Sequence, residues 1–349
     1  MYPGIAIAQA LEESGPTEIL FIGTAYGLEN RVLPGLPYRF ERIWMRGLRR
    51  TLSPANLLFP LRLLVSVLQC GYHFVRFKPH VVIGTGGYVS GPALLAARLL
   101  RIPAVIQEQN SFPGLVNRLL GRFVDQVYLT YEASRAYFKG RDVVVTGNPV
   151  RGDFGRTDRK TARERLGLNQ KHITLLIFGG SQGARAINEA LLEALDTLLA
   201  QPDLQLLWLT GPADYERVQN AVQAYEPRVV VHAFLEDMAS AYAAADLVLC
   251  RAGATTLAEI TLCGLPAILV PYPYATADHQ DFNARALEDA GAAVRLRQTE
   301  LSGPALANIV TELLQQPEKR RAMAEAARKL ARPQAAKEIA QRVRALIGL

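Results

Sequence analysis

Short runs of β-branched and aliphatic residues alternate in this chain with longer segments whose apolar residues recur every three or four positions. The first pattern predicts buried strands, and the second predicts amphipathic helices that cover a sheet. In the first half, the predicted strands are Glu18–Gly23, Arg39–Trp44, Val81–Gly84, Ala104–Gln107, Gln126–Leu129 and Val143–Thr146. In the second half, they are Ile173–Phe178, Leu204–Thr210, Val229–His232, Leu247–Cys250, Ala267–Val270 and Ala293–Leu296. This alternation is typical of a parallel α/β fold.

Helices are predicted between these strands, for example at Pro3–Glu13 and Gly91–Leu100. One face of the helix that starts at Gly183 carries Ala184, Ile187, Leu191, Leu195 and Leu198. An apolar face of this kind packs against a sheet. Three more helices are predicted after the last strand, the final one from about Pro333 to Ile347.

A turn and a charged stretch separate the two halves. Asn148-Pro149-Val150-Arg151-Gly152-Asp153 is followed by the charged residues of 156–165, which is typical of a domain junction. We therefore predict two doubly wound, Rossmann-like domains with ligands in the cleft, at the carboxyl ends of the strands. The predicted N-terminal domain is 1–148 and the C-terminal domain is 149–332. The helix in 333–349 is expected to pack back toward the first domain.

The composition is that of an ordinary globular protein with excess positive charge. Of the 349 residues, 50% are hydrophobic, which excludes a disordered chain. The net charge of +7 favours an anionic partner, and nucleic acid, an acidic membrane surface and diphosphate substrates all fit. The most apolar stretch, Leu57 to Val75, contains a proline, an arginine and a histidine, so it is a poor candidate for a membrane span. Neither the three cysteines nor the five histidines have metal-site spacing, so no metal is predicted.

A glycine-rich turn follows the first strand of the second half. In Gly179-Gly180-Ser181-Gln182-Gly183-Ala184, glycines let the backbone approach a ligand, and the N-terminus of the next helix favours a phosphate. The Ser181 hydroxyl can add a donor. The run is neither a Walker A loop nor a clean dinucleotide fingerprint. The alternative to a phosphate site is a tight turn without a ligand.

Two more polar runs follow strands of the second half. Glu259 lies early in a helix for which Thr255 or Thr256 is the predicted N-cap. Its carboxylate can accept two ribose hydroxyls, and the alternative is a carboxylate that only complements the helix dipole. Asp278-His279-Gln280-Asp281 opens another helix.

The first half has its own glycine loop, Gly84–Pro92, directly after a strand. The next strand ends in Gln107-Glu108-Gln109-Asn110, which places polar side chains at the edge of the predicted cleft. Glu108 can act there as a general base. The alternative is a polar strand end whose hydrogen bonds are satisfied within the protein.

Together these runs resemble the MurG family, which belongs to glycosyltransferase family 28 and has the GT-B fold. The matching segments follow the family's order over nearly the whole chain: Tyr2-Pro3-Gly4, Gly23-Thr24-Ala25, Gly47-Leu48-Arg49, Gly84–Pro92, Glu108-Gln109-Asn110, Gly147–Arg151, Gly179–Ala184, Arg251–Glu259 and Gln280–Ala284. One glycine loop alone is weak evidence, whereas the ordered set is highly specific. The resemblance implies inverting transfer of GlcNAc from UDP-GlcNAc to the C4 hydroxyl of MurNAc in undecaprenyl-diphospho-MurNAc-pentapeptide. This reaction converts lipid I to lipid II in peptidoglycan biosynthesis.

The resemblance also implies roles for individual residues. The implied donor-binding residues are Asn110, Arg151, Gly180, Ser181, Gln182, Gly183, Leu235, Glu259 and Gln280. In the family's pattern Ser181 and its loop hold the diphosphate with Arg151 nearby. Leu235 meets the uracil through its backbone and Glu259 takes the ribose hydroxyls, while Gln280 and Asn110 contact the sugar. The acceptor diphosphate faces Thr85, Gly86, Gly87 and Tyr88.

No cofactor and no obligatory metal are implied, because UDP-GlcNAc is a substrate. The expected partners are UDP-GlcNAc, lipid I and an anionic membrane surface, and not nucleic acid. The expected location is the cytoplasmic face of the inner membrane. Arg42, Arg46, Arg49 and Arg50 precede the apolar helix Leu57–Phe77, and a basic cluster beside exposed apolar residues suits anionic lipid. The alternative is a helix buried in the core.

The start of the chain departs from the family's pattern. The family opens with a strand and a Gly-Gly-Thr-Gly-Gly-His loop before the segment matched by Tyr2-Pro3-Gly4, where Met1 stands here. An internal methionine taken as the start is the expected explanation. We therefore expect a central strand of about 5–6 residues to be missing from the first sheet. The loop's histidine is then missing too, which leaves Glu108 as the candidate base. A form extended upstream is expected to be active and this form nearly inactive.

Two other functions fit the same sequence. One is a related GT-B transferase that uses a UDP-hexose and another lipid acceptor, such as diacylglycerol. The other is a UDP-sugar-binding protein without catalysis.

Overall fold

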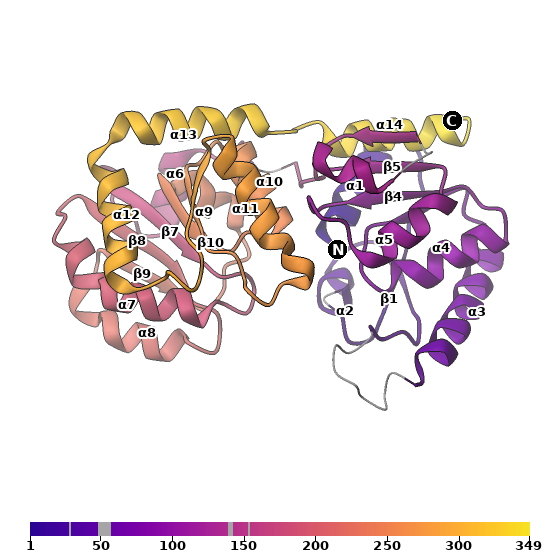
Figure 1. The fold of residues 1–349 in the computed structure, drawn as a ribbon, viewed down its shortest axis with the longest axis horizontal. Coiled ribbons are helices and arrows are strands. Elements are labelled where there is room, and N and C mark those ends of the chain that lie inside the picture. Colours follow the sequence, from indigo (N-terminus) through magenta and orange to yellow (C-terminus); the bar gives the residue numbers. More distant parts are fainter. Residues whose placement is uncertain (28, 48–56, 139–141, 153) are drawn as a thin grey trace. The chain divides into compact units, whose positions relative to one another are not determined.

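The computed structural model describes residues 1–27, 29–47, 57–138, 142–152 and 154–349. Leu48, Arg49, Arg50 and Asp153 lie outside these ranges. Contacts divide the chain into two compact units. The first unit comprises 1–151 and 332–349, and the second comprises 152–331, so the chain begins and ends in the same unit (Figure 1).

The strands of the first unit form two parallel sheets. In one, β1 (Leu20–Gly23) pairs with β2 (Arg39–Arg42). The other has the order β3-β4-β5-β6, with strands β3 (Val82–Gly84), β4 (Ala104–Glu108), β5 (Gln126–Leu129) and β6 (Asp142–Val145). Among the residues described, β1 and β3 each pair on one side only.

Helices cover both faces of the four-stranded sheet. They are α1 (Tyr2–Glu13), α3 (Phe59–Phe77), α4 (Ser90–Leu99), α5 (Leu115–Leu120) and α14 (Ala335–Leu346), and the first unit also has the short helix α2 (Glu29–Val32). In β4, Ile106 packs in a cluster with α3 and α4, and its neighbour Val105 packs in a cluster with α1 and α14. Successive residues point to opposite faces because a strand has a period of two. The C-terminal helix α14 thus lies beside α1 (Figure 1).

The second unit has one six-stranded parallel sheet with the order β12-β11-β10-β7-β8-β9. Its strands are β7 (Ile173–Phe178), β8 (Leu204–Leu209), β9 (Val229–His232), β10 (Leu247–Cys250), β11 (Ala267–Leu269) and β12 (Ala293–Arg295). Its helices are α6 (Arg159–Arg165), α7 (Arg185–Leu199), α8 (Tyr215–Val222), α9 (Met238–Ala244), α10 (Ala254–Cys263), α11 (His279–Asp289), α12 (Gly303–Gln315) and α13 (Pro317–Leu330). Every predicted strand of both units is present, with ends that differ by at most two residues.

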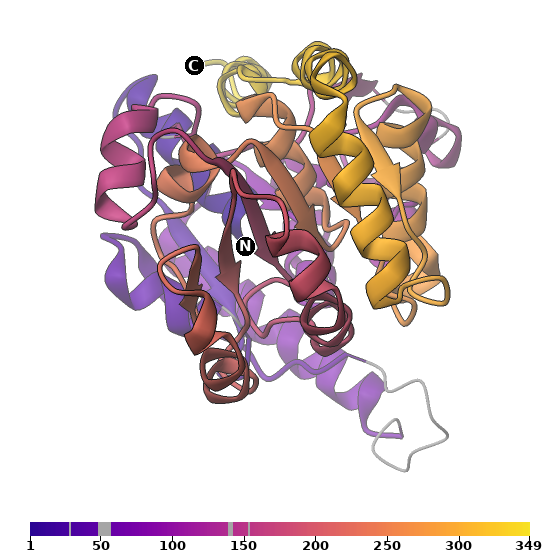
Figure 2. The ribbon, with the colours of Figure 1, turned by 90° about the vertical axis from the view of Figure 1, so that its left-hand side faces the viewer.

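The main core of the second unit lies between this sheet and α7, α8 and α12. Leu191 and Leu195 of α7 pack there with Ile177 of β7, and α12 lies against α7 (Figure 2). The apolar face predicted for α7 is confirmed. The helix begins at Arg185, two residues later than predicted, because Ala184 is still extended.

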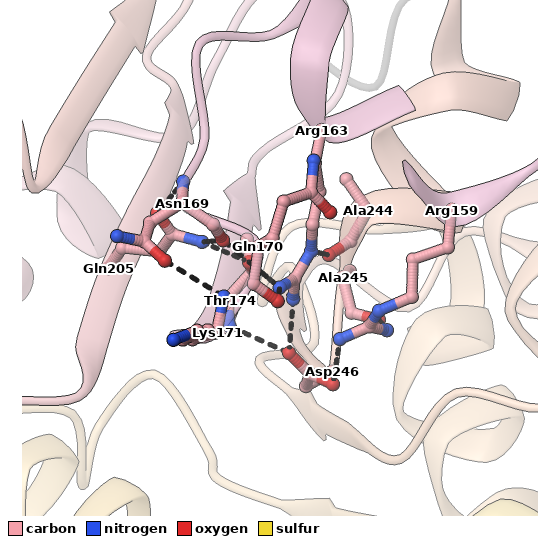
Figure 3. A network of polar contacts seen from close by, with 10 residues as sticks. All are labelled: Arg159, Arg163, Asn169, Gln170, Lys171, Thr174, Gln205, Ala244, Ala245 and Asp246. Atoms are coloured by element: carbon pink, nitrogen blue, oxygen red, sulfur yellow. Dashed lines mark hydrogen bonds and ion pairs between the residues drawn. The ribbon is translucent and has the colours of Figure 1, made fainter. Parts of the chain in front are cut away.

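A buried arginine joins several segments at the amino end of this sheet (Figure 3). The Arg163 side chain is 1% exposed and pairs with Asp246 at 2.8 Å. Its four other N–H groups donate to Ala244 O, Asn169 O, Gln170 O and Thr174 Oγ1. Asp246 also pairs with Arg159, at 2.5 Å. All five guanidinium donors of Arg163 are therefore in use.

Candidate functional site

The glycine loop of the second unit connects β7 to α7 at the carboxyl end of the sheet. Gly180 and Gly183 have φ of 95° and 78°, and the N–H of Gly183 donates to Gly180 O at 2.9 Å. The N-cap of α7 is Ala184, which offers no side-chain hydrogen bond to the first turn. The amides of that turn therefore remain available for an anion.

Close packing also requires glycine in this loop. A Cβ atom on Gly183 would lie 2.0 Å from the carbonyl oxygen of Thr210, and one on Gly179 would lie 2.3 Å from Ala184. A Cβ atom on Gly180 would meet open space, and Ser181 and Gln182 are exposed. Gly179 and Gly183 thus pack the turn closely against its neighbours, while its outer residues stay open to a ligand.

Part of this loop lines a cavity of about 610 Å³ in the second unit. Its walls include Gln182 and Gly183 of the loop, together with Arg251 and Gln280. Arg251 follows β10 and Gln280 lies in the first turn of α11, so neighbouring strands of one sheet bring them together. This edge is where parallel α/β sheets bind ligands.

Arg251 places a positive charge in the cavity wall. Its guanidinium donates to the carbonyl oxygens of Val270 and Pro271, both at 3.2 Å, and to Gln298 Oε1 at 2.6 Å. It also lies 5.4 Å from the ring centre of Tyr272. Burial lowers the pKa of Arg251. Within the described part of the chain, no carboxylate pairs with it, so its charge is available to an anionic ligand.

The prediction for Arg251 was incomplete, because it was matched as part of a motif and given no role. One signal for its role is present in the sequence, since an arginine directly follows a buried strand at the ligand-binding edge. The partners Tyr272 and Gln298 come from loops after two other strands, and only the fold brings them to Arg251.

Gln280 is oriented by the backbone. Its Oε1 accepts a hydrogen bond from the N–H of Tyr272 at 3.0 Å, which turns its amide Nε2 group away from that contact. Leu235 lies half-buried in the loop between β9 and α9, after the strand at one edge of the sheet. Both predicted residues therefore lie at the carboxyl end of the sheet that carries the glycine loop.

Glu259 lies in the second turn of α10, whose N-cap is Gly253 and not Thr255 or Thr256 as predicted. Its Oε2 accepts a hydrogen bond from the Tyr242 hydroxyl at 2.9 Å. The Tyr242 ring lies 5.9 Å from that of Phe178, the last residue before the glycine loop. Glu259 thus lies near the base of the loop, although neither it nor Ser181 lines the 610 Å³ cavity.

The first unit carries the second glycine loop, between β3 and α4. Gly86 and Gly87 have φ of 84° and 76°, a conformation that favours glycine. The Ser90 hydroxyl donates to Gly86 O at 2.6 Å, and Gln109 Nε2 donates to the carbonyl of Thr85 at 3.0 Å. Tyr88 is exposed at the end of this loop. These two side-chain hydrogen bonds fix the loop, while Gly87 and Tyr88 remain exposed to solvent.

The surroundings of Glu108 favour the alternative of a polar strand end whose hydrogen bonds are satisfied within the protein, and its role as a general base stays a prediction. Glu108 is 1% exposed. Its Oε1 accepts from the backbone N–H and side-chain amide of Asn110, and its Oε2 accepts from the Gly114 N–H and Asn117 Nδ2. Four donors occupy the carboxylate, so it holds the loop that follows β4 and offers no open lone pair to a substrate hydroxyl.

Asn110 and Arg151 also belong to the first unit. The Asn110 side chain donates to Glu108 at 3.2 Å, and the Arg151 guanidinium lies 5.7 Å from the ring centre of Tyr2. Their roles in donor binding stay predictions, as do those of Thr85, Gly86, Gly87 and Tyr88 toward the acceptor. Within the described ranges, no cluster of three or more His, Cys, Asp or Glu side chains is arranged to hold a metal ion.

An apolar surface lies on α3 of the first unit. Only Ser66, Cys70 and Phe74 of this helix are buried. Its exposed apolar residues recur every three or four positions, at Leu61, Leu64, Leu68, Tyr72 and Val75. The helix is therefore not a buried core helix. No helix in the described part of the chain is long and apolar enough to span a membrane.

Two α/β units with parallel sheets, matched by both domain models of glycosyltransferase family 28, define the class as a glycosyltransferase with the GT-B fold. Residues 1–129 match the N-terminal domain of glycosyltransferase family 28, and residues 174–343 match its C-terminal domain. The chain belongs to the MurG family within glycosyltransferase family 28.

Relatives and solved structures support this assignment over nearly the full length. A UDP-N-acetylglucosamine--N-acetylmuramyl-(pentapeptide) pyrophosphoryl-undecaprenol N-acetylglucosamine transferase of Myxococcus xanthus is 44% identical, over 97% of this chain and 88% of that protein. The protein of the same name from Desulforamulus reducens is 41% identical, over 97% and 93%. The crystal structure of Acinetobacter baumannii MurG has a TM-score of 0.77 and 32% identity, covering 99% of this chain and 95% of that one.

Proposed function

We propose that this chain transfers GlcNAc from UDP-GlcNAc to the C4 hydroxyl of MurNAc in undecaprenyl-diphospho-MurNAc-pentapeptide, with inversion at the anomeric carbon. The observation that carries the proposal is the cavity of the second unit, where the glycine loop, Arg251 and Gln280 meet. Relatives named for this reaction over nearly the whole chain support the choice of substrates.

The donor diphosphate binds at the glycine loop. The free amides of the first turn of α7 and the Ser181 hydroxyl donate to phosphate oxygens. Arg251 adds a full positive charge, and no carboxylate of the described ranges pairs with it. These groups favour the reaction because negative charge grows on UDP as the sugar leaves.

The sugar and nucleoside bind at the same edge of the sheet. Gln280 uses its Nε2 group toward the GlcNAc hydroxyls, while its Oε1 is held by the backbone. Glu259 accepts the ribose hydroxyls and is oriented by Tyr242. Leu235 meets the uracil through its backbone. For the first unit, the proposed roles are acceptor diphosphate binding by the loop of Gly86 and Gly87 and donor contacts by Asn110 and Arg151.

The same proposal places the enzyme at the cytoplasmic face of the membrane, with α3 against the lipid. Leu64 and Leu68 are 57% and 64% exposed on the apolar face of this helix. Arg62 lies over the exposed ring of Trp44, and Arg76 lies over that of Tyr72. Arginine beside tyrosine and tryptophan is typical of surfaces that lie at a lipid headgroup layer.

The transfer reaction is tested with radiolabelled UDP-GlcNAc and a lipid I analogue, beside a parallel reaction with diacylglycerol. The expected result is label in the lipid I product only. Gln280→Ala should lower kcat/KM by about tenfold or more, because a hydrogen bond to the sugar is lost. Binding of UDP-GlcNAc without transfer to either acceptor would contradict the proposed reaction and favour a binding protein. Transfer to diacylglycerol would favour the related lipid transferase.

Membrane attachment is tested by sedimentation with vesicles that contain anionic lipid at low salt. The double variant Leu64→Ser, Leu68→Ser should lose most of the bound fraction. Leu99→Ser is the matched control, because Leu99 is 74% exposed on α4 and not on α3. Equal retention of the double variant and the wild type would contradict the role of α3.

A further inference from the structure

A second cavity lies in the second unit, away from the glycine loop. Its volume is about 450 Å³. Asp246 and Pro266, which line it, directly precede β10 and β11, so the cavity is at the amino end of the sheet. The glycine loop is at the carboxyl end. The two cavities share no lining residue.

Arginines dominate the charge of this second cavity. Its lining includes Arg159, Arg320, Arg321 and Arg328 but, among the residues that the structure describes, only one carboxylate, that of Asp246. That carboxylate is already shared between Arg159 and the buried Arg163 (Figure 3). The lining is therefore strongly positive.

The partners of these arginines leave most of this charge uncompensated. Arg320 donates to backbone carbonyls of Leu313 and Leu314, which carry no charge. Arg321 pairs with the exposed Glu318 at 2.7 Å. The Arg328 guanidinium has no hydrogen-bond or ion-pair partner in the part of the chain that the structure describes. It lies over Gly264, where a Cβ atom would be 2.5 Å from Nε.

One residue connects this cavity with the donor side of the unit. Tyr242 lines the cavity, and its hydroxyl donates to Glu259 at 2.9 Å. Its ring also lies 5.9 Å from that of Phe178, next to the glycine loop. Tyr242 itself is 1% exposed, so it has little freedom to move independently of its neighbours.

We propose that the second cavity binds a small phosphate-bearing anion, and that its occupancy tightens donor binding by holding Tyr242 and Glu259 in place. Guanidinium groups bind phosphate oxygens with charge-assisted hydrogen bonds. A volume of about 450 Å³ accommodates a phosphate with a small organic group. The binding site stands on the cavity alone, whereas the coupling rests on the proposed function, because it requires Glu259 to contact the donor.

Binding is tested by calorimetric titration of the full chain with inorganic phosphate and, separately, with glycerol 1-phosphate. These two probes distinguish free phosphate from a phospholipid headgroup as the source of the anion. Saturating UDP is present, so that the glycine loop is occupied, and chloride keeps the ionic strength constant. Arg328→Ala should weaken binding by about tenfold. Lys329→Ala is the control, because Lys329 is the exposed neighbour that does not line the cavity. Equal affinities of the wild type and Arg328→Ala overturn the site.

Coupling is tested by measuring the dissociation constant of UDP-GlcNAc with and without saturating phosphate. Donor binding should tighten about fivefold or more, and UDP-GlcNAc should tighten phosphate binding by the same factor, as linkage requires. Tyr242→Phe should keep phosphate binding and lose the coupling. Donor affinity that phosphate leaves unchanged or weakens overturns the coupling. If the chain does not bind UDP-GlcNAc at all, the proposed function fails, and the phosphate titration still decides whether the site exists.

Discussion

Replacing Arg163 by alanine should destabilise the second unit strongly. The variant removes five hydrogen bonds from a side chain that is 1% exposed. Breaking a buried ion pair by deleting one partner typically costs about 3–5 kcal/mol. In the variant, Asp246 is 25% exposed and retains its ion pair with Arg159 and its hydrogen bond from the N–H of Thr174, so its charge remains compensated. We therefore expect the lower end of this range, about 3 kcal/mol.

The free energy of unfolding is measured by urea titration with tryptophan fluorescence. The chain has two tryptophans, and Trp208 is fully buried in the second unit, so a Trp44→Phe background reports that unit alone. With a typical urea dependence, the midpoint should fall by about 1–2 M.

Arg159→Ala is the matched control, because it removes a 47% exposed partner of the same carboxylate. An exposed pair contributes about 0–1 kcal/mol. If Arg163→Ala lowers the midpoint no more than Arg159→Ala does, the reasoning about burial is refuted.

Three other predictions follow from single contacts. Gly183→Ala should lower the free energy of unfolding by about 2 kcal/mol or more, because φ is positive and the new Cβ atom meets Thr210 O. Gly180→Ala, whose Cβ atom meets open space, should lower it by about 1 kcal/mol. The same urea titration compares the two variants, and equal losses of stability would contradict the clash at Gly183. Burial lowers the pKa of His232, so below about pH 6.5 its imidazole takes up a proton readily only in the unfolded state. The stability it contributes is present above that pH and is lost as pH falls, and His232→Gln should flatten the decline in a pH series of urea titrations; an equally steep decline in the variant would exclude His232 as the cause. Arg251→Ala should weaken UDP-GlcNAc binding by about tenfold in calorimetry, and an unchanged affinity would remove Arg251 from the donor site.

The strands were predictable because parallel strands covered on both faces are continuous apolar runs. Hydrophobic periodicity also identified the buried face of α7. Helix starts were less predictable, since the N-cap of α10 is a glycine and Ala184 remains extended before α7. These starts depend on backbone geometry at the turn, which residue type alone does not determine.

The candidate site was predictable where a motif is contiguous and not where its environment decides the chemistry. The loop at Gly183 could be recognised from its glycines and its place after a strand. Glu108 could not be judged, because the donors from Gly114 and Asn117 that occupy its carboxylate come from residues 6 and 9 positions later. The position of Arg251 in the cavity wall depends on its hydrogen bonds to Pro271 and Gln298, which follow two other strands, so the local sequence did not reveal it.

The return of the chain to its first unit has a consequence for folding during synthesis. The cluster that contains Ile7 of α1 is completed by Ile339 and Val343 of α14. A ribosome therefore releases all of the second unit, residues 152–331, before the first unit can close its core. Domains usually fold in the order of their synthesis. Here the unit that begins the polypeptide is expected to finish last, with the apolar side of α1 covered by β4 and β5 but not by α14 until the final helix emerges.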